Sequence, residues 1–294
     1  MLRSRRLSVR QYCPARRELA SFASGAPGTA RHSRILRRMT SFADRLASAV
    51  EEKGAPLCVG IDPDPALMPA GLGLTEFCRG IVDAVAPVAV VVKPQTAFFE
   101  AYGADGWDAL RDVCDYARDA GLLVLVDGKR GDVPSTMHAY AAALAPLADA
   151  VTVNPYVGED SLEPFLAHDG LGIFAIVKTS NPGSADLQDV ELGDGRPFWH
   201  HVAERVDVWD IEAVVGATHP DVLADARALM PRAVLLLPGV GAQSGRLEDL
   251  APAFSAGPAS ALPSASRSVI YAADPAAAAA ALSDQLRSVL SAVG

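Results

Sequence analysis

Charges of alternating sign are concentrated in the segment DGKRGD, residues 127–132, directly after an apolar run. Asp127 and Lys129 are two residues apart, so on a strand both side chains would leave on the same face. Lys93 ends another apolar run and can reach the same space. Unpaired charges in a half-buried place are costly, so opposite signs are needed to place them together. Fixed charges can stabilise charge that develops during a reaction, although a solvated charged turn would have the same sequence.

A glycine-rich loop, PGVGAQSGR at residues 238–246, indicates a second type of site. Glycines leave backbone N–H groups free to approach an anion, and Gln243 lies among them. Arg267 follows another apolar run and could pair with phosphate oxygens in a bidentate manner. Together these features favour a phosphate site over a merely flexible connection.

Other polar residues also follow apolar runs, among them Asp62, Asn154 and the segment 178–181. The six histidines form no HxH or HExxH spacing, so no metal site is predicted. No serine lies in a GxSxG motif, which disfavours an α/β-hydrolase.

All these candidates follow short apolar runs that alternate with helical patterns. Continuous apolar runs indicate strands buried on both faces of a parallel sheet. Eight such units within residues 39–294 predict a single-domain (β/α)8 barrel, with its active site where the strands end. An open doubly wound sheet is the alternative, but such a sheet is expected to have a GxGxxG turn after its first strand, and the first run here has none. The runs are residues 57–61, 88–93, 122–127, 150–154, 172–178, 212–217, 233–238 and a weaker one, with a proline, at 261–266.

Two helices have recognisable ends. Ser41 and Asp44 have the spacing of a capping box, and Gly54 stops the helix that they begin. The last helix is capped by Asp274 and has Pro275 at its first position.

Composition narrows the class of protein. Half of the 294 residues are hydrophobic and 21% are charged, which indicates a folded chain. Residues 1–38 hold ten arginines and one acidic residue, so 26 − 10 = 16 basic and 35 − 1 = 34 acidic residues, a charge of −18, remain for the rest. An acidic folded part of this kind is a poor nucleic-acid binder. No apolar segment is long enough to span a membrane, and four cysteines without a CxxC pair indicate free thiols and a cytoplasmic protein.

Residues 1–38 are expected to be a disordered basic extension outside the barrel. Three interpretations remain open: a transit-type presequence, a flexible basic tail, or a start codon misassigned upstream of Met39.

Six segments, in chain order, resemble orotidine 5′-phosphate decarboxylases of the type 2 bacterial group. They are VVVKPQTAFFEAYG, VDGKRGDVPST, NPYVGEDSLEPF, VKTSNPGSADLQD, VVGAT and PGVGAQSG, and the resemblance extends from about residue 41 to residue 290. It implies a homodimeric (β/α)8 barrel that converts orotidine 5′-monophosphate to UMP without a cofactor or metal.

The resemblance also implies residue roles. Lys93, Asp127, Lys129 and Asp132 would form a charge array, with Asp132 reaching into the partner subunit's site and Lys129 giving a proton to C6. Lys93 and Asp132 would orient Lys129 by pairing. The implied substrate-binding residues are Asp62 for ribose hydroxyls, Ser180 for the pyrimidine, Gln243 and Arg267 for phosphate, and Thr136 beside Asp132 at the dimer-spanning site.

Two other functions are compatible with a barrel of this kind. A sugar-phosphate decarboxylase or aldolase would use a similar array with Mg²⁺ and would need a further carboxylate, for which Glu100 and Glu159 are the candidates. A non-catalytic phosphate-sugar-binding barrel would lack the complete array. The insertion at residues 181–206, with Gln188 and Asp189, has no role derivable from the sequence.

Overall fold

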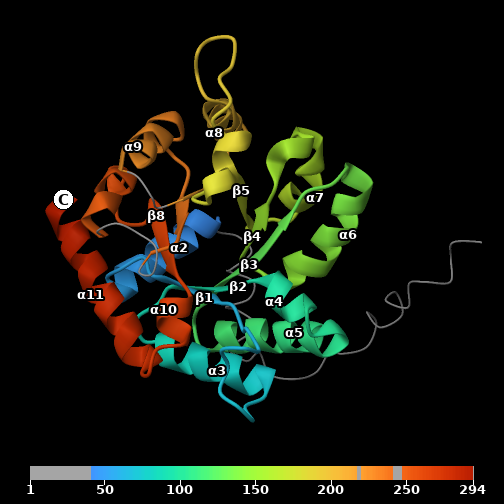
Figure 1. Ribbon diagram of the computed structural model, residues 1–294, viewed down its shortest axis with the longest axis vertical. Coiled ribbons are helices and arrows are strands. Elements are labelled where there is room, and N and C mark those ends of the chain that lie inside the picture. The colour runs from blue at the N-terminus through green and yellow to red at the C-terminus, as the bar shows by residue number, and fades with distance from the viewer. Residues whose placement is uncertain (1–40, 217–219, 241–246, 294) are drawn as a thin grey trace, which may run out of the picture. The chain divides into compact units, whose positions relative to one another are not determined.

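The computed structural model describes residues 41–216, 220–240 and 247–293. Eight parallel strands close into a barrel in chain order, because β1 pairs with both β2 and β8 (Figure 1). The predicted (β/α)8 barrel is confirmed, and its closure excludes the open sheet. The strands are β1 (Cys58–Ile61), β2 (Val91–Pro94), β3 (Leu123–Arg130), β4 (Ala150–Val153), β5 (Gly172–Lys178), β6 (Glu212–Val215), β7 (Leu235–Pro238) and β8 (Ala261–Ala265).

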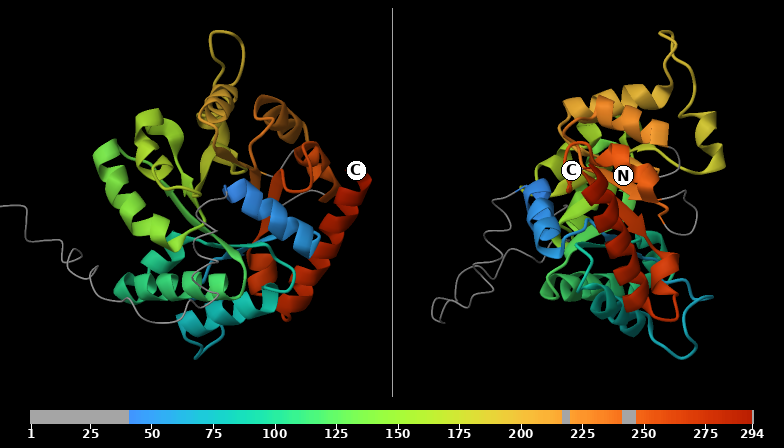
Figure 2. Two further views of the ribbon diagram at one scale, coloured as in Figure 1. Left: turned by 180° about the vertical axis from the view of Figure 1, so that it is seen from behind. Right: turned by 90° about the vertical axis from the view of Figure 1, so that its left-hand side faces the viewer.

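Helices surround the barrel, and α2 (Phe42–Lys53) lies across one end of it (Figure 2). The other α-helices are α3 (Leu74–Val85), α4 (Thr96–Glu100), α5 (Gly103–Asp119), α6 (Pro134–Leu144), α7 (Glu163–Leu166), α8 (Phe198–Val208), α9 (Pro220–Leu229), α10 (Arg267–Ile270) and α11 (Pro275–Val293). Short 3₁₀ helices are η2 (Ala145–Leu147), η3 (Pro155–Val157), η4 (Glu159–Ser161), η5 (Pro182–Asp186) and η6 (Leu247–Phe254).

Helix α2 closes the amino-terminal end of the barrel. Its capping box at Ser41 is formed as predicted, and Gly54 ends the helix with a left-handed φ of 78°. The buried face of α2 packs on the apolar interior of the barrel, where the ring of Phe42 meets Phe174 edge to face at 5.6 Å. A Cβ atom on Gly172 would lie 2.7 Å from the Phe42 ring, so this close approach requires glycine.

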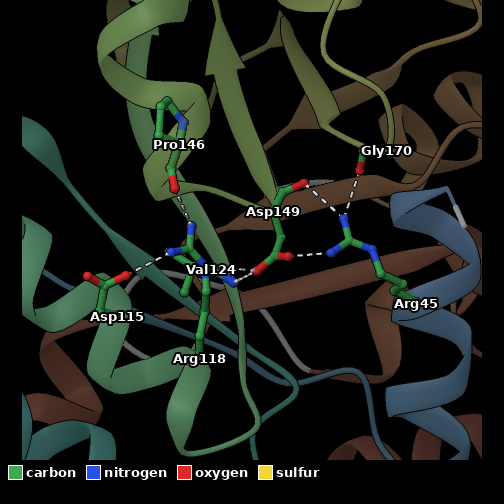
Figure 3. Close-up of polar contacts among 7 residues, drawn as sticks. All are labelled: Arg45, Asp115, Arg118, Val124, Pro146, Asp149 and Gly170. Carbon is green, nitrogen blue, oxygen red and sulfur yellow. Dashed lines mark hydrogen bonds and ion pairs between the residues drawn. The ribbon is translucent and has the colours of Figure 1, made fainter. Parts of the chain in front are cut away.

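A buried ion-pair network ties α2 to the barrel (Figure 3). Asp149, just before β4, accepts hydrogen bonds from the Arg45 guanidinium and from the Val124 amide, the latter at 2.9 Å. Arg45 also donates to the Gly170 carbonyl oxygen at 2.7 Å, and the Arg118 guanidinium lies 3.8 Å from Asp149. Since the amino-terminal face of such barrels serves stability, we assign this network a structural role.

The last strand is better formed than its sequence suggests. Pro263 lies inside β8 and pairs with Leu237 of β7, whereas the ladder from β8 to β1 begins only at Ser264. The missing N–H of the proline therefore falls outside the β1 ladder, and the proline does not weaken closure of the barrel.

In the described part of the chain, no helix combines the length and the apolar character needed to cross a membrane.

The Asp149→Ala variant should lose about 3 kcal/mol of unfolding free energy, because it leaves the largely buried Arg45 guanidinium without its counter-charge. Urea unfolding followed by circular dichroism measures this loss. The matched control is Asp108→Ala, which removes an exposed pair with Arg111 and should cost less than about 1 kcal/mol. Equal losses in the two variants would contradict the assigned role.

Candidate active site

The interior of the barrel changes from apolar to polar along its strands. Inward side chains near α2 are apolar, and alternation along each strand places polar ones next to the carboxyl ends. Lys93, Asp127, Thr152 and Ser264 form this polar layer, and each is 6% exposed or less. Polar groups buried at this end of a barrel indicate an active site.

Asp127 is the centre of the layer. Its Oδ2 accepts hydrogen bonds from Lys93 Nζ at 2.6 Å and from Gln95 Nε2 at 3.1 Å. Its Oδ1 accepts hydrogen bonds from Lys129 Nζ at 2.6 Å and from Thr152 Oγ1 at 2.7 Å. The predicted convergence of Lys93, Asp127 and Lys129 is therefore present, and the carboxylate is fully hydrogen-bonded.

Electrostatic interactions keep Asp127 and Lys93 ionised despite their burial. Burial alone would raise the pKa of Asp127, but the ammonium groups of Lys93 and Lys129 outweigh it and hold that pKa well below its usual range. Burial alone would lower the pKa of Lys93, yet the carboxylates of Asp127 and Asp62 raise it above its usual range. The two lysines share one carboxylate, so Lys93 and Lys129 are linked through Asp127.

Lys129 does not lie on a regular strand. Its φ of 43° is left-handed, and the register between β3 and β4 shifts between Val126 and Arg130. The contact between Asp127 and Lys129 thus depends on a bulge, and not on strand alternation alone as the sequence suggested.

Asp132 and Thr136 lie on one segment after β3. The Asp132 carboxylate accepts a hydrogen bond from the Val133 amide at 2.7 Å, and Thr136 is half-buried on α6. Within the described residues of this one chain, no hydrogen bond or ion pair joins Asp132 to Lys129.

Asp62 follows β1 at the edge of the polar layer. Its Oδ2 accepts a hydrogen bond from Ser266 Oγ, and its carbonyl oxygen accepts one from the Tyr271 hydroxyl at 2.8 Å. Its Oδ1 is buried and has no hydrogen-bond partner among the described residues. A buried acceptor of this kind is costly unless a ligand donates to it.

Ser180 is exposed just beyond β5 and rests on β6. A Cβ atom on Gly216, which follows β6, would lie 2.8 Å from the Ser180 nitrogen, so glycine is needed for this approach. The neighbouring Thr179 is held by Gln188, whose side chain accepts from the Thr179 amide at 2.8 Å and donates to its hydroxyl at 2.9 Å. Asp189 pairs with Lys178 at 2.5 Å. The insertion therefore braces the segment that carries Ser180.

Arg267 and Gln243 are the two residues predicted to bind phosphate. Arg267 is exposed at the first position of α10, directly after β8, as predicted. Gln243 lies outside the described residues.

Sequence reasoning missed four groups that complete the site. Thr152 and Gln95 bind Asp127, and Ser266 and Tyr271 bind Asp62. Thr152, Gln95 and Ser266 lie on or just beyond a strand end, which was the only available signal. Tyr271 follows the short helix α10, and nothing in its own motif marked it.

Most of the chain matches the model of a known protein family. Residues 55–282 match the orotidine 5′-phosphate decarboxylase / HUMPS family. The chain belongs to this family.

Individual relatives of the family agree with the match. The chain is 46% identical over 268 residues to an orotidine 5′-phosphate decarboxylase of Roseiflexus castenholzii, covering 86% of this chain and 98% of the relative. It is 44% identical to one from Deinococcus radiodurans, over 79% and 90% of the two chains. The solved OMP decarboxylase of Leishmania donovani superposes with a TM-score of 0.75 at 36% identity, over 85% and 98% of the two chains.

Glu100 and Glu159, the candidate carboxylates for the sugar-phosphate alternative, are both paired with arginines. Glu100 binds the Arg130 guanidinium, and Glu159 binds Arg205 at 3.2 Å. Within residues 41–216, 220–240 and 247–293, no three His, Cys, Asp or Glu side chains are grouped to hold a metal ion.

The Asp127→Ala variant should lose about 3 kcal/mol of unfolding free energy, because the Lys93 ammonium stays buried without its main counter-charge. Adding Lys93→Met to the same chain should restore most of the loss, since it removes the stranded charge. Urea unfolding of both variants measures this coupling. If the double variant were no more stable than Asp127→Ala, the buried pair would not be what stabilises this layer.

Proposed function

We propose that this enzyme removes CO2 from orotidine 5′-monophosphate and produces UMP, the last step of de novo pyrimidine biosynthesis. The observation that carries the proposal is the ion-paired Lys93–Asp127–Lys129 cluster at the carboxyl end of the barrel. The curated relatives cited above have the name orotidine 5′-phosphate decarboxylase. On the six segments quoted from the sequence, we assign the chain to the type 2 bacterial group.

Lys129 is the proton donor in this proposal. When the bond between C6 and the carboxylate breaks, CO2 leaves and the electron pair stays on C6. A fixed ammonium beside C6 stabilises this localised charge and then transfers a proton to it. The side chain of Lys129 is 38% exposed while its Nζ remains bound to Asp127, so a substrate entering at the strand ends can reach it. The amine regains its proton from solvent, and the step uses no cofactor or metal.

Asp127 and Lys93 prepare Lys129 for this step. The low pKa of Asp127 keeps its carboxylate charged, and that charge holds the Lys129 ammonium in place. A carboxylate beside the substrate's own carboxylate also disfavours the bound ground state and promotes departure of CO2.

The remaining predicted residues bind the substrate away from C6. The unpartnered Oδ1 of Asp62 is an acceptor for a ribose hydroxyl. Ser180 contacts the pyrimidine, and Gln243 and Arg267 bind the phosphate. Phosphate binding far from C6 supplies energy that holds the charge array in its reactive geometry.

The active enzyme in this proposal is a homodimer in which Asp132 and Thr136 complete the partner subunit's site. Exposed apolar side chains support this arrangement, because Val133 and Val157 are half-exposed and Tyr156 is 79% exposed. These residues belong to neighbouring segments, since Gly131 packs against the Asn154 backbone. An apolar surface beside a charged site residue is typical of an interface.

The wild-type protein should convert orotidine 5′-monophosphate to UMP in the presence of EDTA, followed by ultraviolet absorbance and chromatography. The Lys129→Ala variant should lose at least about 10³-fold in kcat, because it loses both the electrostatic stabilisation and the proton donor. Its affinity for UMP, measured by calorimetry, should change little. Arg111→Ala, on the exposed face of α5, is the control. Turnover by Lys129→Ala would contradict the proton-donor role, and a requirement for Mg²⁺ would favour the sugar-phosphate alternative.

Mixing inactive Lys129→Ala and Asp132→Asn subunits tests whether the sites are shared. If Asp132 crosses the interface, random mixed dimers contain one intact site each, and activity should recover to about a quarter of wild type. Each variant re-mixed with itself is the control. No recovery, with subunit exchange verified by mass spectrometry, would place Asp132 in the site of its own chain.

A further inference from the structure

We infer that Thr152 is a positioning residue that holds both Asp127 and the backbone of Lys129 in their reactive geometry. The inference rests on the proposed function, in which these two residues act on the substrate. Thr152 is not among the residues that the sequence motifs singled out, and its own role follows from its place opposite the irregular part of β3.

Thr152 lies in β4 facing the barrel interior and is 1% exposed. The ladder between the two strands pairs Val126 with Val151 and Arg130 with Val153. Thr152 therefore faces a bulge that contains Asp127 and Lys129. Regular main-chain pairing is interrupted there, so the amide groups of the bulge need other partners.

The Thr152 hydroxyl supplies this partner. The Lys129 amide donates to Thr152 Oγ1 at 2.9 Å, and the same hydroxyl donates to Asp127 Oδ1 at 2.7 Å. One oxygen thus accepts from the backbone of the proton donor and donates to the carboxylate that binds its ammonium. These two hydrogen bonds fix the rotation of the Thr152 hydroxyl. They also connect the backbone amide of Lys129 to the carboxylate that binds its ammonium group.

The constraint matters because Lys129 has a left-handed backbone. A φ of 43° is disfavoured for a residue with a Cβ atom, and it persists only where the surroundings enforce it. The hydrogen bond from its amide to Thr152 enforces it here. The backbone angle in turn sets where the ammonium lies, and a misplacement of about 1 Å of a catalytic group can cost about 10²-fold in rate.

The test compares three variants of the full chain. Thr152→Val keeps the shape of the side chain and removes both hydrogen bonds, whereas Thr152→Ser keeps the hydroxyl. Ser283→Ala is the control, because Ser283 is a buried hydroxyl in α11, and its Oγ has no hydrogen-bond partner in the part of the chain that the structure describes. For each variant, kcat and KM for orotidine 5′-monophosphate, the Kd of UMP and the thermal midpoint are measured.

We expect Thr152→Val to lower kcat by about 10- to 100-fold while KM and the UMP Kd change less than about threefold. Thr152→Ser should retain most of the wild-type kcat. A merely structural role predicts a different pattern, in which the thermal midpoint falls and kcat per folded molecule is unchanged. That pattern, or equal kcat values for the valine and serine variants, would overturn the inference.

Hydrogen exchange of the Lys129 amide in the free enzyme provides a readout independent of turnover. Exchange should accelerate in Thr152→Val and stay slow in Thr152→Ser and Ser283→Ala, because only the valine variant lacks the acceptor. Unchanged exchange in Thr152→Val would overturn the inference. If the wild type failed to turn over orotidine 5′-monophosphate, the proposed function would fail, and the exchange data would still decide whether Thr152 holds Lys129.

Discussion

The site depends on one buried carboxylate that two ammonium groups share. Asp127 is 3% exposed, and its ionised form is tolerable only because Lys93 and Lys129 bind it from two sides. Lys93 is also buried, and it is charged because the carboxylate of Asp127 binds it. Neither Asp127 nor Lys93 could remain charged at this depth without a counter-charge, and the closed barrel brings the two together.

The barrel interior is divided into an apolar layer near α2 and a polar layer at the carboxyl ends of the strands, and this division makes the cluster possible. Apolar inward residues near α2 exclude water from one end, and Phe42 closes that end against Phe174. The polar layer follows one step further along the strands. The apolar layer and the Asp149 network fix the strands at the amino-terminal end of the barrel. The charged groups at the carboxyl end are therefore held by a rigid scaffold, which electrostatic catalysis requires.

Sequence reasoning succeeded where the pattern is local. The eight strands, the capping box at Ser41 and the convergence of Lys93, Asp127 and Lys129 were predicted because strand alternation and strand order in a barrel are regular. The weakest of the predicted strands, the one with Pro263, is also present, since a proline is harmless where the neighbouring ladder has not yet begun. Sequence reasoning expected Lys93 to orient Lys129 by pairing but did not identify Asp127 as the carboxylate that both ammonium groups bind.

The sequence by itself determined the fold class, the family and the residue types of the charge array, because these follow from apolar periodicity and from short motifs. Only the tertiary structure decided which hydrogen-bond and ion-pair partner each charged side chain has. The hydroxyl of Thr152 joins β4 to the bulge at Lys129 in β3, and the side chain of Gln188 folds back onto Thr179 within the connection after β5. Such contacts depend on register and on local departures from regular strands, and neither is encoded in the spacing of a single motif.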